Sequence, residues 1–180
     1  HGTTSDVEEF LPSKLGESSG APSAKMGFFF AKSARVASSY AQGFNTYKHT
    51  TIGSLANKIT RGRYESINEA MLRFFGLPSE TGIEGANVVP VYLSIQNPKV
   101  VDFERATYRE KSYAEIISEA KEQGHDGVII QNTRDPGYGD GGGDFTDIYV
   151  AFEPTQIKSS FNSGAFDAND PRISYSMKPD

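Results

Sequence analysis

The amino-acid sequence predicts a single α+β domain, in which several short strands are flanked by a few helices. The length supports one domain, because 180 residues are enough to bury one hydrophobic core, so we expect residues 1–180 to fold together. Runs rich in aromatic and β-branched residues, such as residues 27–31, are typical of strands. Two capping boxes, at residues 66–69 and 112–115, predict helix starts, because the paired Ser and Glu side chains can bond free backbone amides.

The first half of the chain begins with an apolar strand over residues 27–31. Ser33 can cap a helix that runs to Gln42, because apolar side chains recur in it at helical spacing. Residues 44–64 are polar and irregular, and we interpret them as a lid or a substrate loop. The capping box at residues 66–69 then starts a second helix, which Gly76 and Pro78 end.

The second half of the chain alternates strands with one further helix. The helix begins at the second capping box, and Gly124 ends it. A glycine-rich loop over residues 135–144 cannot form a regular element, since glycine leaves the backbone too free. The tail over residues 158–180 is polar, so we expect it to lie on the surface. The expected strands cover residues 88–95, 100–103, 127–132 and 147–153.

The composition indicates a folded protein with a polar surface and excludes several classes of function. Hydrophobic residues make up 37%, aromatic residues 12% and charged residues 23%. The net charge of -5 argues against nonspecific binding of nucleic acid, which depends on clustered Lys and Arg. The absence of cysteine excludes disulfides and thiol nucleophiles. We expect no metal site, because the three histidines are scattered and no ligand motif is present.

The sequence also bears on location. It contains no run of about 20 apolar residues and no basic-then-apolar start, so we expect neither a membrane span nor a secretion signal. We therefore expect a cytoplasmic domain, including the case of delivery into a host cell. The sequence lacks an initiator Met, which suggests a piece of a longer polypeptide.

Three separated segments contain the candidate functional residues. These are His1-Gly2-Thr3, the strand at residues 27–31 with Ser33 and Tyr40 after it, and residues 147–159. In order and content they resemble the three motifs of ADP-ribosyltransferases of the poly-ADP-ribose polymerase and diphtheria-toxin branch. The third is similar to the form found in phage and mobile-element polyvalent proteins. The resemblance implies two packed, mainly antiparallel sheets with flanking helices and a cleft for NAD, the co-substrate.

The resemblance implies roles for the first two motifs. His1 would bond the ribose hydroxyls, and the backbone of Gly2, next to Thr3, would bond the carboxamide of nicotinamide. Phe29 and Tyr40 would sandwich the nicotinamide ring. The alternatives remain a disordered chain end for the first motif and plain core packing for the aromatic side chains, which is favoured for Phe28 and Phe30. The resemblance also places Phe30 and Ser33 at the NAD site.

The third motif departs from the family pattern at the catalytic acid. Counting back from Gln156 puts Ile148 where active polymerases carry a glutamate, with Asp147 one position earlier. A shift of one residue moves a side chain to the other face of a strand, so Asp147 can substitute only through a bulge or an altered register. Asp147 is the first candidate for the acid, with Glu153 and Asp144 as lesser ones. Each could instead be a solvated surface residue.

The resemblance implies transfer of ADP-ribose from NAD to a protein or nucleic-acid acceptor, with release of nicotinamide. A carboxylate would stabilise the positive charge that develops on the ribose. The flexible glycine-rich loop occupies the position at which the family recognises its acceptor. Two alternatives remain open: an NAD glycohydrolase, and a module that binds NAD without catalysis. A role as a toxin-like effector is an association that comes from the resemblance alone.

Overall fold

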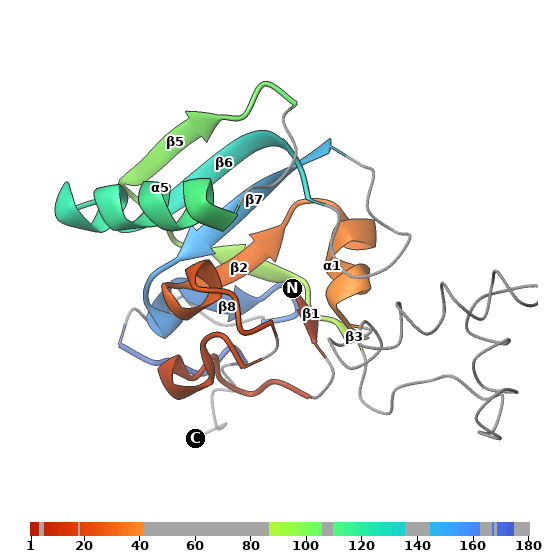
Figure 1. Ribbon diagram of the computed structural model, residues 1–180. Coiled ribbons are helices and arrows are strands. Elements are labelled where there is room, and N and C mark those ends of the chain that lie inside the picture. Colours follow the sequence, from red (N-terminus) through yellow and green to blue (C-terminus); the bar gives the residue numbers. More distant parts are fainter. Residues whose placement is uncertain are drawn as a thin grey trace, which may run out of the picture.

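The structure is a computed structural model and describes residues 1–3, 6–17, 19–41, 87–105, 110–135, 145–162, 167 and 169–174 (Figure 1). The expectations for residues 44–64, for the helix after residue 66 and for most of the glycine-rich loop lie outside these residues. The elements in chain order are β1 (Gly2–Thr3), η1 (Pro12–Lys14), η2 (Ser23–Lys25), β2 (Phe28–Ala31), α1 (Ala34–Ala41), β3 (Asn87–Val88), β4 (Val91–Leu93), β5 (Pro98–Asp102), α5 (Glu110–Glu122), β6 (Gly127–Arg134), β7 (Phe145–Ala151), η3 (Pro154–Gln156) and β8 (Ile157–Ser159).

A four-stranded sheet in the order β2-β7-β6-β5 forms the centre of the fold (Figure 1). Strands β2, β7 and β6 pair antiparallel, whereas β5 and β6 pair parallel. The pairing is thus mainly antiparallel, as expected, and the exception is the parallel pair of β5 and β6. It has a simple cause: α5 lies between β5 and β6 in the chain, and a crossover helix returns the chain in the same direction.

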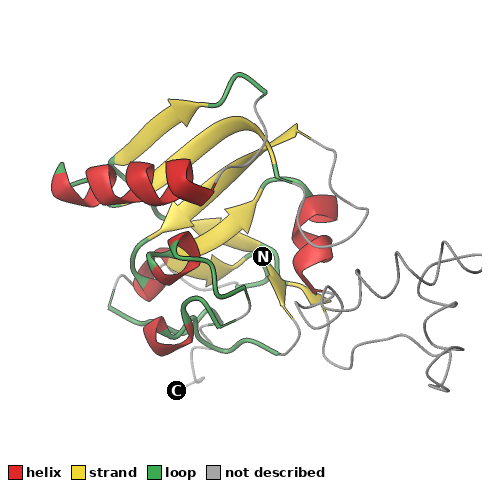
Figure 2. Ribbon diagram, viewed as in Figure 1, coloured by secondary structure: helices red, strands yellow, loops and turns green. Residues whose placement is uncertain are grey.

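One face of this sheet is covered by α5 (Figure 2). Alternate side chains of β6 and β7 point toward the helix and form a hydrophobic core with it. The opposite face packs against a second layer, which is built from the β1–β3 and β4–β8 pairs. The core under α5 consists of Tyr113, Ile117, Ala120, Val128, Ile130, Ile148 and Val150.

The second layer depends on one extended segment, residues 87–93. Its first part pairs with β1, where the amide of Val89 extends the ladder by donating to the carbonyl of His1 at 2.8 Å. Its second part pairs with β8. The predicted strand over 88–95 is therefore two short strands with different partners, separated at Val89 and Pro90. Aromatic and aliphatic side chains fill the space between the layers, among them Phe10, Phe28, Phe30, Ile157 and Ile173.

Local signals located the helix starts with different accuracy. Ser33 precedes α1 as predicted, and its hydroxyl accepts a bond from the amide of Val36 at 3.4 Å. The second described helix, α5, begins at Glu110, two residues before the predicted cap at Ser112. Gly124 follows α5 with a φ of +76°, the left-handed conformation that commonly ends a helix.

The prediction that residues 158–180 lie on the surface is wrong for three of them. Lys158, Ser159 and Ile173 are buried, at 3%, 6% and 4% exposure. The Nζ atom of Lys158 donates to the carbonyls of Asp170 and Arg172. The amide of Ser159 donates to the carbonyl of Ile173 at 2.7 Å. These buried groups need partners, and the returning chain supplies them.

Candidate functional site

The imidazole of His1 is held in one orientation by packing and by a backbone bond. Its Nδ1 atom lies 2.8 Å from the carbonyl oxygen of Phe29. Since a carbonyl can only accept, Nδ1 carries the proton, and Nε2 of the neutral ring is then an acceptor. The ring packs edge-on against Phe10, with centroids 5.0 Å apart, and lies 5.5 Å from the ring of Phe30.

Gly2 brings β1 into contact with α1, the helix that carries Tyr40. A Cβ atom at Gly2 would overlap the backbone oxygen of Ala37 and would lie 2.8 Å from the backbone nitrogen of Ala41. Glycine is therefore needed for backbone packing at this point, apart from any role toward a ligand. Thr3 completes β1 and pairs with Asn87 of β3.

The two strand aromatics point to opposite faces of the sheet. Phe30 is 4% exposed and packs against Phe10 and His1, so it supports the imidazole and presents almost no surface to a ligand. This burial favours the core-packing alternative for Phe30 over direct contact with NAD. Phe29 is half-buried on the α5 side, where its ring stacks on Tyr113 at 6.4 Å with an interplanar angle of 7°.

Tyr40 is tied to the end of β6 through its hydroxyl. That hydroxyl donates to Oδ1 of Asp135 at 2.6 Å, and Asp135 is only 5% exposed. Two residues earlier, Oγ1 of Thr133 lies 3.0 Å from the hydroxyl of Tyr113. Burial raises the pKa of Tyr113 well above its usual range. Sequence reasoning missed Asp135, because nothing local distinguishes it from the other aspartates of the glycine-rich loop.

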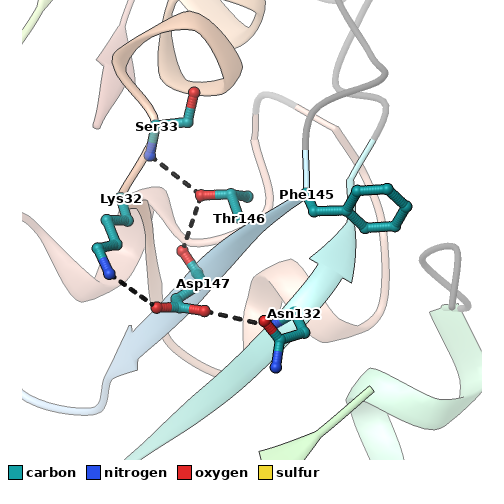
Figure 3. Close-up of a pocket in the computed structure, with 6 residues that line it drawn as sticks. All are labelled: Lys32, Ser33, Asn132, Phe145, Thr146 and Asp147. Atoms are coloured by element: carbon teal, nitrogen blue, oxygen red, sulfur yellow. Dashed lines mark hydrogen bonds and ion pairs between the residues drawn. The ribbon is translucent and has the colours of Figure 1, made fainter. Parts of the chain in front are cut away.

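Asp147 lines an open pocket with a volume of about 330 Å³ (Figure 3). Its Oδ1 accepts the backbone amide of Asn132 at 3.1 Å, and its Oδ2 lies 3.2 Å from Nζ of Lys32. The Asp147 side chain is 20% exposed and that of Lys32 is 70% exposed, so the ion pair faces solvent. The pocket is lined by Lys32, Ser33, Asn132, Phe145, Thr146 and Asp147.

A bulge in β6 lies directly opposite Asp147. Ile130 pairs with Ile148 and Thr133 with Thr146, so two residues of β6 face the single residue Asp147. One of the two is Asn132, whose φ of 52° is left-handed. Its side-chain amide lies 3.1 Å from both carboxylate oxygens of Asp102. Together with the backbone amide of Glu104, which contributes most, this bond lowers the pKa of Asp102.

The two faces of β7 separate the candidates for the acid. Ile148 is 2% exposed and belongs to the core under α5, whereas Asp147 lines the pocket. Glu153 forms the capping box of η3 with Gln156, which gives it a structural task. Asp144 lies outside the described residues.

Ser33 joins the pocket to α1. Its backbone amide donates to Oγ1 of Thr146 at 3.0 Å, while its hydroxyl caps the helix. The segment from Phe29 to Tyr40 therefore connects three parts of the candidate site. Its first residue bonds to His1, Lys32 pairs with Asp147, and its last residue is Tyr40 in α1.

Among the described residues, no group of three His, Asp or Glu side chains is placed to hold a metal ion. Within the same part of the chain, no helix has the length and apolar character that crossing a membrane requires.

Comparison with known proteins supplies the family. A family model described as ADP-ribosyltransferase in polyvalent proteins matches residues 1–166. No curated protein and no solved structure matches the chain. The family match spans most of the sequence and includes all three motifs and the pocket around Asp147. The chain therefore belongs to the family of ADP-ribosyltransferase domains of polyvalent proteins.

Proposed function

We propose that this domain transfers ADP-ribose from NAD to a protein or nucleic-acid acceptor and releases nicotinamide. The observation that carries the proposal is the position of Asp147, on the pocket face of β7 and opposite a bulge, in a chain of this family. A carboxylate in an open pocket can reach a sugar hydroxyl, which a core residue such as Ile148 cannot.

The reaction needs few groups. The bond between nicotinamide nitrogen and ribose carbon breaks, its electron pair leaves with nicotinamide, and positive charge develops on the ribose. Asp147 hydrogen-bonds a ribose hydroxyl and stabilises this charge. An acceptor oxygen or nitrogen then attacks the carbon and loses its proton to solvent or to a nearby base.

The remaining residues bind and orient the co-substrate. Nε2 of His1 accepts a bond from a ribose hydroxyl, because Nδ1 is committed to the carbonyl of Phe29. Tyr40 and Phe29 hold the nicotinamide ring, and the backbone of Gly2 bonds its carboxamide. Thr3 and Ser33 complete the lining.

Lys32 also contacts the proposed acid. Its ammonium group pairs with Oδ2 of Asp147. Because the Lys32 side chain is largely exposed, a sugar hydroxyl can take its place at Oδ2 at little cost in stability.

The family description supports a further part of the proposal. Domains of this family occur in polyvalent proteins, which fits a domain that works as one unit of a longer polypeptide. We place its action in the cytoplasm of the cell that contains or receives it. Toxin-like effector activity is one form that this action can take.

One experiment separates transfer from its alternatives. The protein is incubated with NAD labelled in the adenylate phosphate, with and without a cell lysate, beside a lysate that received no protein. Label on macromolecules supports transfer, and free labelled ADP-ribose without labelled macromolecules identifies a glycohydrolase. Unchanged NAD in both incubations identifies a module without catalysis and contradicts the proposal.

A further inference from the structure

We infer that Asp135 is a positioning residue that fixes the ring of Tyr40 for the nicotinamide of NAD, and thereby sets the preference for NAD over ADP-ribose. The inference rests on the proposed function, in which Tyr40 stacks on that ring. It starts from the hydroxyl of Tyr40, which donates to Oδ1 of Asp135 at 2.6 Å across 95 positions of sequence. This length is typical of a hydroxyl bound to a carboxylate, the stronger class of hydrogen bond.

The end of β6 anchors aromatic residues from two helices. Thr133 and Asp135 are buried and the residue between them is exposed, so both side chains point to one face of the strand. Thr133 bonds the hydroxyl of Tyr113 from α5, and Asp135 bonds that of Tyr40 from α1. The ring of Tyr113 in turn stacks on Phe29. Both rings of the proposed nicotinamide clamp are therefore braced from the same strand end.

Such a brace matters for Tyr40 because its side chain lies on α1 and is only partly buried, so packing alone does not fix its ring. A stacked ring must keep its plane, and a bond at the far end of the phenol fixes both side-chain torsions. The ring of NAD is also a cation, and the carboxylate behind the phenol favours a positive charge on the phenol's face.

This arrangement predicts a specific signature in binding. ADP-ribose lacks the nicotinamide ring but shares the rest of NAD. Loss of the brace should therefore weaken binding of NAD and leave binding of ADP-ribose almost unchanged. A purely structural role for Asp135 would weaken both ligands together.

The experiment is calorimetric titration with ADP-ribose and with an uncleavable NAD analogue that has a methylene group in place of the ring oxygen of the nicotinamide ribose. The variants are Asp135→Ala, Asp135→Asn, Tyr40→Phe and the double variant Asp135→Ala with Tyr40→Phe. For Asp135→Ala and Tyr40→Phe we expect roughly ten-fold weaker binding of the analogue, with ADP-ribose within about two-fold of wild type. Asp135→Asn should fall between wild type and Asp135→Ala, because its amide oxygen still accepts the bond but carries no charge.

The double variant tests whether Asp135 acts through Tyr40. If it does, the double variant binds the analogue no more weakly than either single variant. Asp126→Ala is the matched control, since it also removes a carboxylate that accepts hydrogen bonds, here from the amides of Gln96 and Asn97, just before the opposite end of β6. It should lower stability and leave the ratio of the two affinities unchanged. Tyr40→Phe keeps the test valid should Asp135→Ala fail to fold.

The outcomes are distinct. Equal losses for the two ligands, a ratio unchanged in the folded single variants, or additive losses in the double variant would overturn the role of Asp135 and leave the proposed function standing. Failure of the wild-type protein to bind the NAD analogue would overturn the proposed function and this inference together.

Discussion

The His1 region and the Asp147 pocket are held together by different forces. His1 lies among the aromatic rings of Phe10 and Phe30, and its strand lies against the backbone of α1. Asp147 is held by one backbone amide and by an exposed lysine. Apolar contacts and close backbone packing contribute strongly to stability, whereas exposed ion pairs contribute little. Substitutions in the first region should therefore lower stability, and substitutions in the second should mainly lower activity.

Asp147→Asn should produce the largest effect, and it should appear in catalysis. We expect turnover to fall roughly 100- to 1,000-fold, because a group that stabilises charge in the transition state is lost. The free energy of unfolding should change by less than about 1 kcal/mol, since the exposed pair with Lys32 contributes little. Transfer of labelled ADP-ribose and urea unfolding measure the two quantities.

Ile148→Val is the control on the opposite face of β7. It should lower the free energy of unfolding by about 1 kcal/mol and keep turnover within about two-fold of wild type. The reverse pattern, with Ile148→Val reducing turnover and Asp147→Asn leaving it intact, would contradict the assignment of faces.

Gly2→Ala should produce the largest loss of stability in the His1 region. The added methyl group meets backbone atoms of α1, which cannot move aside cheaply. We expect the free energy of unfolding to fall by about 3 kcal/mol. Gly20→Ala is the comparison: Gly20 has a φ of +69° and nothing within 4 Å of the added carbon, so only backbone strain of about 1–2 kcal/mol is expected. Equal losses in the two variants would show that β1 does not depend on close packing against α1.

Substitutions of Asn132 test how the bulge holds Asp147. Asn132→Ala is strained at a φ of 52° and should reduce turnover roughly ten-fold, because the amide that binds Asp147 shifts. Asn132→Gly adopts this conformation without strain and keeps the amide, so turnover should stay within about three-fold of wild type. Similar activity in both variants would exclude a role for the left-handed backbone.

Features with local causes could be predicted from the sequence. Ser33 caps α1 through a bond within one turn, and the β-branched residues of β6 and β7 favour strands wherever they pair. The division of residues 87–93 into two strands depends on which distant strands pair with each part, and no local pattern encodes that choice. The burial of Lys158 likewise depends on carbonyls more than ten positions away.

The candidate site also combines features that local sequence predicts with features that depend on distant partners. Motif resemblance suggested His1 and Tyr40, and counting along one strand could not decide between Asp147 and Ile148. The structure separates the two by face: Ile148 lies in the core under α5, and Asp147 lines the pocket opposite the bulge in β6. Asp135 was missed for a related reason, because its partner Tyr40 lies 95 residues earlier.

The most direct test of the central claim is a crystal structure of the domain with the uncleavable NAD analogue. The ribose attached to nicotinamide should lie in the pocket, with one hydroxyl within hydrogen-bonding distance of a carboxylate oxygen of Asp147. The nicotinamide ring should lie against Tyr40. An analogue bound elsewhere, with Asp147 still paired to Lys32 and Asn132, would contradict the account.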